Sequence, residues 1–144
     1  MQTSTQVARE TRFRDGVGAF IRRDFDALEH GMRRDVVMRF PGTSWLAGTY
    51  LGPSQVGRCI VGLRQVLESS EDHATFTHED NLMIVSHQVK LHGPQHDVDM
   101  SFSIAISYDA DDRVMSISVE PEDLALFDHV LKTALVALDR DTNR

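Results

Sequence analysis

The spacing of hydrophobic residues in this 144-residue chain changes near Ser69, and this change limits the possible folds more than any other feature. Before Ser69, apolar residues recur every three or four positions, as on one face of an amphipathic helix. After it, four segments have the composition of strands, at 74–83, 87–92, 97–108 and 113–120. Turn-forming residues at 92–95 and 109–112 separate the later segments. Helices followed by antiparallel strands predict an α+β fold, with helices packed on one face of a curved sheet.

The remaining elements complete a single domain over residues 1–144. Apolar spacing predicts a helix in the first quarter of the chain, a second short helix after Asp24 and a third from Pro53 to Leu67. Short strands are expected at 36–40 and 49–51. A C-terminal helix is expected at 122–139, with an apolar stripe formed by Leu124, Phe127, Leu131, Leu135 and Leu138. Residues 1–10 are expected to form a flexible tail.

Composition excludes several classes of protein. With 15 basic and 22 acidic residues the net charge is −7, which disfavours nucleic-acid binding because phosphate recognition needs a basic surface. No apolar run approaches the ~18 residues of a membrane span, and residues 1–10 lack the features of a signal peptide. The single cysteine, Cys59, cannot form an internal disulfide. We therefore expect a cytoplasmic protein that binds neither nucleic acid nor membranes.

Motifs for metals and nucleotides are missing from the sequence. His87, His92 and His96 lie close together, but their spacing matches no ligand pattern of a metal site. No glycine-rich phosphate loop follows a predicted strand. We expect no metal and no cofactor.

Several segments carry a resemblance to a known family. They are Arg23–Leu28, Asp35–Gly42, Leu46–Gly52, Arg113–Glu120 and Asp123–Phe127. Over about residues 10 to 130 the sequence resembles the SnoaL-like polyketide cyclases of the nuclear transport factor 2-like (NTF2-like) superfamily, which also contains ketosteroid isomerases. The resemblance implies a cone-shaped fold in which N-terminal helices close over a curved mixed or antiparallel sheet and enclose an apolar pocket. The C-terminal helix extends past this minimal fold.

The catalytic groups of a ketosteroid isomerase are absent from the matching positions. That type of enzyme uses an Asp base, together with a Tyr and a protonated Asp as hydrogen-bond donors. The three positions fall on Phe40, Gly16 and near Ile104. Because hydrocarbon side chains transfer no protons, we do not expect isomerisation by that apparatus.

Strand alternation predicts which residues line the pocket that the resemblance implies. In 97–108, Val98, Met100, Phe102, Ile104 and Ile106 share one face, and Asp and Ser residues occupy the other. The predicted substrate-binding residues are Phe20, Met38, Phe40, Trp45, Val89, Leu91, Met100, Phe102, Ile104, Met115, Ile117 and Val119. An ordinary hydrophobic core is the alternative. The Ser-rich face is expected to form a homodimer interface, with a solvated surface as the alternative.

Few polar residues are placed to act in such a pocket. Phe76, His78 and Asp80 alternate along one predicted strand and would share a face, so Asp80 could orient the imidazole of His78 for proton transfer. Tyr50 is expected near the pocket mouth. By resemblance, Glu120 lies close to an acidic position of the cyclases, although alternation puts it opposite the apolar face. The candidate catalytic residues are therefore His78, Asp80, Glu120 and Tyr50, with a surface pair as the alternative for His78 and Asp80.

The sequence and its resemblance together favour a cofactor-independent polyketide cyclase of the lyase or isomerase type, acting in natural-product (antibiotic) biosynthesis. An apolar pocket with few ionisable groups suits ring closure, including cycloaddition, by holding a flexible hydrophobic substrate in a reactive conformation. One alternative is a non-catalytic binding protein of the same fold. Another is an isomerase or epoxide hydrolase of the superfamily, the latter requiring an Asp-Arg-Asp set such as Asp80, Arg39 and Asp99, whose predicted faces disagree.

Overall fold

The computed structural model describes residues 2–22, 24–93 and 96–142, with side chains described except at 25, 28, 69–73 and 134–142. The N-terminal elements are α1 (Ser4–Arg22), α2 (Phe25–Glu29), β1 (Met32–Phe40), β2 (Gly48–Leu51) and α3 (Gly52–Arg64). They are followed by β3 (Leu67–Glu79), β4 (Leu82–His92), β5 (Asp97–Tyr108), β6 (Val114–Pro121) and α4 (Leu124–Thr142). Within the described part of the chain, no helix is both long enough and apolar enough to cross a membrane.

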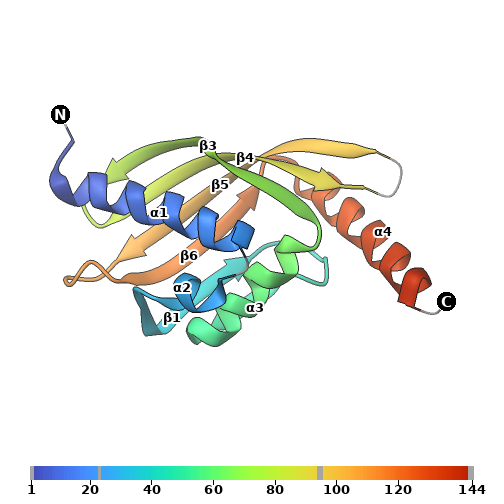
Figure 1. Cartoon of the computed structure of the whole chain (residues 1–144), viewed down its shortest axis with the longest axis horizontal. Helices are drawn as coiled ribbons and strands as arrows, with labels where there is room; N and C mark the ends of the chain where they lie inside the picture. The colour runs from blue at the N-terminus through green and yellow to red at the C-terminus, as the bar shows by residue number, and fades with distance from the viewer. Residues whose placement is uncertain (1, 23, 94–95, 143–144) are drawn as a thin grey trace.

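The six strands form one mixed sheet in the order β2-β1-β6-β5-β4-β3. The β1–β6 pair is parallel and the other pairs are antiparallel. In Figure 1, α1 crosses the strands at one side of the sheet, α2 and α3 lie beside β1, and α4 lies at the far end. This arrangement confirms the expected α+β fold with helices packed on a curved sheet. Residues 94 and 95 of the expected turn at 92–95 lie outside the described residues.

The N-terminal helix begins earlier than its apolar spacing indicates. Residues 4–10, expected to form a flexible tail, are the first turns of α1, and that expectation is wrong for them. Arg9 is 5% exposed because its guanidinium bonds Asp112 Oδ1 from Nε and NH2, both at 2.8 Å, and the Asp80 carbonyl oxygen at 3.0 Å. Glu10, also buried, lies 2.5 Å from Nε2 of His78 on β3. These contacts with β3 and the β5–β6 turn hold the start of α1 on the sheet.

The C-terminal helix closes one end of the core. Phe127 is fully buried, with its ring centroid 5.2 Å from that of Phe40 on β1 and 5.4 Å from that of Phe102 on β5. Asp128 accepts a hydrogen bond from the Thr43 backbone N–H at 3.1 Å. Gly42 has a φ of 98°, and a Cβ there would lie 2.5 Å from the Asp128 carboxylate, so this close approach needs glycine. Leu135 and Leu138, two residues of the expected apolar stripe, lie outside the described side chains.

A bulge in β6 changes which of its residues face inward. Ser107 pairs with Ser116, whereas the next residue of β5, Tyr108, pairs with Val114, so Met115 is an extra residue on β6. The bulge turns Val114 toward the helices, and Met115 is 39% exposed. The simple alternation that placed Met115 with Ile117 and Val119 is therefore wrong at Met115.

The outer face of the sheet carries small polar residues that bond to one another. Ser86 and Ser101 lie 3.4 Å apart at their hydroxyls, and Ser107 and Ser116 lie 2.5 Å apart. Gln88 donates to Ser101 Oγ at 3.0 Å. Because these polar groups already bond to one another, covering this face with a second protein surface would cost few hydrogen bonds to water. We propose that it forms a homodimer interface.

The dimer proposal predicts a change of oligomeric state in an Ala105→Glu variant, because Ala105 lies centrally on this face between Ile84 of β4 and Ser118 of β6. The unmodified protein should be a dimer at micromolar concentration in light scattering. Ala105→Glu should shift it to a monomer, since two like charges would face each other across the two-fold axis. Gln65→Glu, an exposed site after α3, should leave the dimer intact. A strict monomer before any substitution would contradict the proposal.

Candidate functional site

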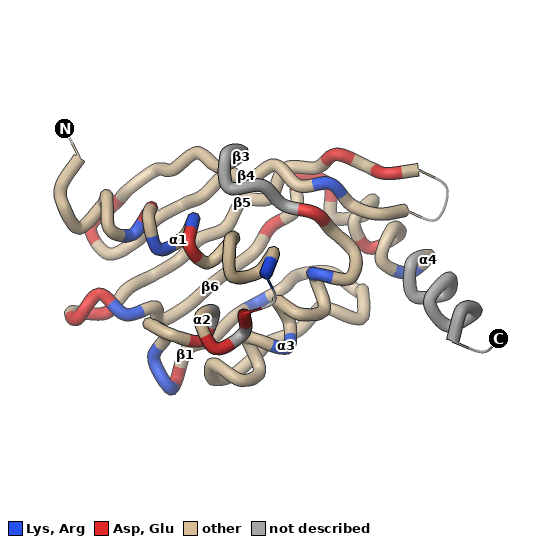
Figure 2. Tube along the Cα trace, viewed as in Figure 1, with Lys and Arg blue, Asp and Glu red and all other residues tan. Residues whose placement is uncertain are grey.

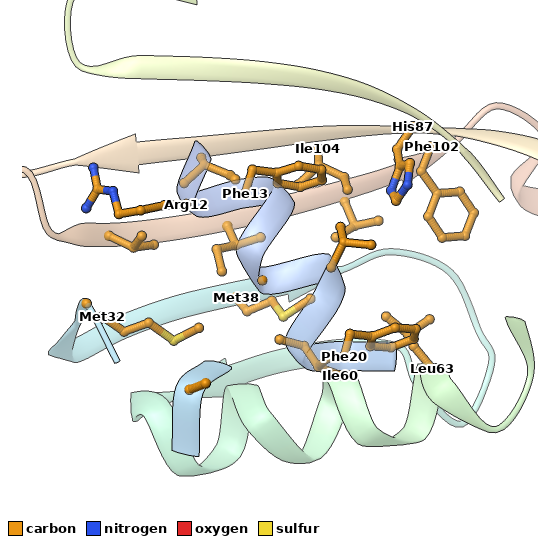
Figure 3. Close-up of a pocket in the computed structure, with 18 of the residues that line it drawn as sticks. Arg12, Phe13, Phe20, Met32, Met38, Ile60, Leu63, His87, Phe102 and Ile104 are labelled. Atoms are coloured by element: carbon orange, nitrogen blue, oxygen red, sulfur yellow. The ribbon is translucent and has the colours of Figure 1, made fainter. Parts of the chain in front are cut away.

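A cavity of about 240 Å³ lies between the inner face of the sheet and the helices. Residues of α1 form one side, with Phe13 and Phe20 among them, and Ile60 and Leu63 of α3 form another. Figure 3 shows these side chains converging with Met38 of β1 and Ile104 of β5 on a common space. Amphipathic helices facing an alternating sheet leave apolar side chains on both sides of this space.

Most of the predicted substrate-binding residues meet at this cavity. Those on its wall are Phe20, Met38, Val89, Phe102, Ile104, Ile117 and Val119. Phe40, Leu91 and Met100 instead belong to the buried core that includes Phe127. The Trp45 indole is 37% exposed; it covers Gly62 of α3 and donates to the Leu131 carbonyl at 3.3 Å. Phe127 of α4 packs against Phe40 of this second group and against Phe102 of the cavity wall.

The four candidate catalytic residues lie elsewhere. His78 points toward α1 and pairs with Glu10, and its Nδ1 is buried without a partner among the described atoms. Asp80 does not lie on the same strand face as His78, because β3 ends at Glu79 and the alternation of side chains stops there. Asp80 is exposed. The expected pairing of His78 with Asp80 is therefore wrong.

Tyr50 and Glu120 are also outside the cavity wall. The Tyr50 hydroxyl donates to the Leu46 carbonyl at 2.6 Å, and burial, with the neighbouring Cys59, raises its pKa to about 12. Glu120 is exposed on the outer face opposite Ser103, as alternation predicts. Cys59 is buried next to Tyr50, with its pKa raised to about 11 by burial. Tyr50, Cys59 and Glu120 are therefore not among the described residues of the cavity wall.

Among the residues with described side chains, four polar ones line the cavity: Arg12, His30, His87 and Tyr108. Two of them are marked in the sequence by strand alternation. His87 alternates with Val85 and Val89 on β4, and Tyr108 continues the apolar series of Ile104 and Ile106 on β5. A histidine or tyrosine on an otherwise apolar strand face is a candidate for the site. His87 is 4% exposed, and the Phe13 ring meets it edge-on at 5.5 Å.

The ionisable residues on the described cavity wall include basic groups but no carboxylates. They include Arg12 and two histidines, and none of the described wall residues is Asp or Glu. Burial raises the pKa of Tyr108 to about 12, against the opposing effect of Arg12 and Arg9. The phenol is therefore neutral at physiological pH and acts as a hydrogen-bonding group, not as an anion.

The histidines do not assemble into a metal centre in the described part of the chain. His87 lies on the cavity wall, whereas His92 is half-exposed and lies 3.3 Å from Asp97 and 3.5 Å from Glu68. No group of three His, Cys, Asp or Glu side chains suited to hold a metal occurs among the described residues.

The curved sheet, the covering helices and the apolar cavity define the NTF2-like fold. No family model matches the sequence, and no curated protein matches it. Similar solved structures include an NTF2-like protein of Burkholderia xenovorans (TM-score 0.72, 19% identity, covering 91% of this chain and 98% of that one). A proposed polyketide cyclase of Xanthomonas campestris has a TM-score of 0.67 and 13% identity over 86% of this chain and 97% of that one. A steroid delta-isomerase of Pseudomonas aeruginosa has a TM-score of 0.61 and 15% identity over 98% and 93%. At these identities the likeness shows the fold alone.

The two tyrosines of the chain, Tyr50 and Tyr108, should ionise late. Absorbance at 295 nm should show both titrating near pH 12 in the folded protein, against about 10 in denaturant. Since the folded state then holds more protons above pH 10, their contribution to stability is complete below pH 10 and declines as the pH rises toward 12. Tyr50→Phe and Tyr108→Phe assign the two steps. A step near pH 10 in the folded protein would contradict the burial of that ring.

Proposed function

We propose that this protein is a cofactor-independent cyclase that closes a ring in a hydrophobic linear substrate, as in polyketide biosynthesis, mainly by holding the substrate in a reactive conformation. The observation that carries the proposal is the apolar cavity of about 240 Å³, whose described wall residues include only four polar ones. Such a wall binds hydrocarbon and excludes water. The fold that this chain shares with a proposed polyketide cyclase supports the same class.

The length of the cavity suits a linear substrate. Phe102 and Tyr108, both on its wall, are six residues apart on β5, a distance of about 20 Å along a strand. His87 pairs with Phe102 in the sheet, so it lies at one end, and Arg12 lies at the other (Figure 3). A flexible chain bound along this path is restricted to few conformations, which removes much of the entropic cost of joining its parts; well-oriented intramolecular reactions gain up to ~7–11 kcal/mol in this way.

His87 is a buried histidine on the described cavity wall, and an imidazole is a common general base in enzymes. In a ring closure of the aldol type, the neutral imidazole accepts a proton from the carbon next to a carbonyl. That carbon then bonds to a second carbonyl carbon of the same chain, and the proton passes to the oxygen of the second carbonyl. The product is an isomer of the substrate, so the reaction requires no oxidant and no cofactor.

Binding without reaction is the competing function, because an apolar cavity alone serves it equally well. The epoxide hydrolase alternative has less support. Arg39, Asp80 and Asp99 are all exposed, and none of them is on the described cavity wall. An Asp-Arg-Asp set facing a bound epoxide is therefore not assembled from these residues.

A Gly16→Leu substitution should block the cavity without damaging the fold. Gly16 lies on the cavity wall in α1, and a Cβ there meets no atom within 4 Å. Leucine also favours the helix over glycine by up to ~1 kcal/mol, so thermal stability should be kept or raised. Incubation with a synthetic linear tetraketide thioester and mass analysis should show cyclised product with the unmodified protein and none with Gly16→Leu. Ala8→Leu, an exposed site on the same helix, is the matched control and should remain active. Equal activity of both variants would contradict the cavity as the site.

A His87→Gln substitution separates catalysis from binding. The turnover rate of the tetraketide should fall by about a hundredfold or more, because a glutamine cannot accept the proton, while binding measured by calorimetry should change little. His129→Gln, the same change at an exposed site on α4, should behave like the unmodified protein. Tight binding of unchanged tetraketide by the unmodified protein would favour the non-catalytic alternative.

A further inference from the structure

Two arginines of α1 share one carboxylate at the end of the cavity. Arg9 bonds Asp112 Oδ1 at 2.8 Å, and Arg12 pairs with Asp112 Oδ2 and donates to the Asp112 carbonyl oxygen at 2.8 Å. Both guanidinium groups lie over the Tyr108 ring, at 4.2 Å and 5.5 Å from its centroid. Two positive groups against one carboxylate leave a local excess of positive charge.

The other charged residues at the β5–β6 turn pair with one another or with Arg33, which also pairs with Asp35 at 2.7 Å. Asp109 lies 3.4 Å from Arg113 and 3.7 Å from Arg33, and Asp111 lies 3.5 Å from Arg113. Figure 2 shows this turn as a cluster of both signs beside β1, with the basic residues of α1 nearby. None of these ion-paired residues is on the described cavity wall, to which Arg12 and Tyr108 belong.

The two arginines differ in what they can still bind. Arg9 is buried and divides its guanidinium between Asp112 and the Asp80 carbonyl. The Arg12 side chain is 42% exposed, and in the described part of the chain its hydrogen bonds go to Asp112 alone. A guanidinium has five N–H donors, so Arg12 retains donors for a ligand.

The cavity as a whole favours an anion over a cation. The chain has seven more acidic than basic residues, yet no described residue of the cavity wall is Asp or Glu. Among the described wall residues a bound cation would find no carboxylate, whereas an anion would find Arg12. Near apolar walls such an interaction is stronger than in bulk water.

We propose that the ligand of this cavity is an apolar molecule with one acidic group, a carboxylate, which binds Arg12 beside Tyr108 while its hydrocarbon part extends toward His87. This inference rests on the proposed function, because it identifies the substrate class of the same cavity. The carboxylate accepts charge-assisted hydrogen bonds from Arg12, and the neutral Tyr108 phenol lies at the same end as a further hydrogen-bonding group. The acid thus fixes the direction in which a linear chain lies.

Three ten-carbon probes that differ only in their head group test the proposal: decanoate, decan-1-ol and decylammonium. Isothermal titration calorimetry at pH 7.5 should show decanoate binding about tenfold or more tightly than decan-1-ol, and decylammonium binding most weakly. Arg12→Gln should remove the preference for decanoate and leave decan-1-ol binding unchanged. Arg12→Lys should keep part of it. Arg58→Gln removes the same charge from an exposed site on α3 outside the cavity wall and should behave like the unmodified protein.

The Gly16→Leu variant makes the outcomes distinguishable. If decanoate and decan-1-ol bind equally and Gly16→Leu abolishes both, the cavity binds apolar molecules and the acid-recognition proposal is overturned. If none of the three probes binds, the proposed function fails together with it. Decanoate binding that survives Gly16→Leu, or an Arg58→Gln effect as large as that of Arg12→Gln, would place the anion elsewhere and overturn the proposal as well.

Discussion

The buried guanidinium of Arg9 is the contact on which the architecture of the site depends. It joins the first turns of α1 to the β3–β4 turn through the Asp80 carbonyl and to the β5–β6 turn through Asp112. Burying a cation costs free energy unless its charge is compensated. Here the guanidinium of Arg9 is paired with Asp112 and stacks over the ring of Tyr108. Because α1 supplies one wall of the cavity, these contacts fix the position of that wall relative to the sheet.

The other limits of the cavity come from irregularities in regular elements. The bulge at Met115 turns Val114 inward and brings it to the wall beside Tyr108. At the opposite end, Phe127 of α4 packs between Phe40 and Phe102, so the core is solid there. The cavity therefore lies between an aromatic cluster at one end and an ionic cluster at the other.

The sequence predicted the parts of this structure that follow from local periodicity. Alternation along β5 gave the inward face correctly from Val98 to Ile106, and the helical spacing of Phe13, Val17 and Phe20 located most of α1. The prediction failed where contacts between residues far apart in the sequence determine the structure. Arg9 and Asp112 are 103 positions apart, and nothing near Arg9 indicates that it is buried. The end of β3 at Glu79 and the bulge in β6 likewise depend on pairing with neighbouring strands, so the expected His78–Asp80 pair and the inward Met115 were wrong.

The placement of polar groups explains how so apolar a cavity can be selective. Most of its wall gives affinity without direction, since hydrophobic contact is nearly independent of orientation. Direction must come from polar residues of the wall, and three of those described lie apart: Arg12 and Tyr108 near the β5–β6 turn, and His87 beside Phe102. A group held at one end determines which atom of a linear chain reaches the other. In the reaction that we propose, anchoring by Arg12 and proton transfer by His87 are separated in this way, so that the length of the substrate would select the carbon that reacts.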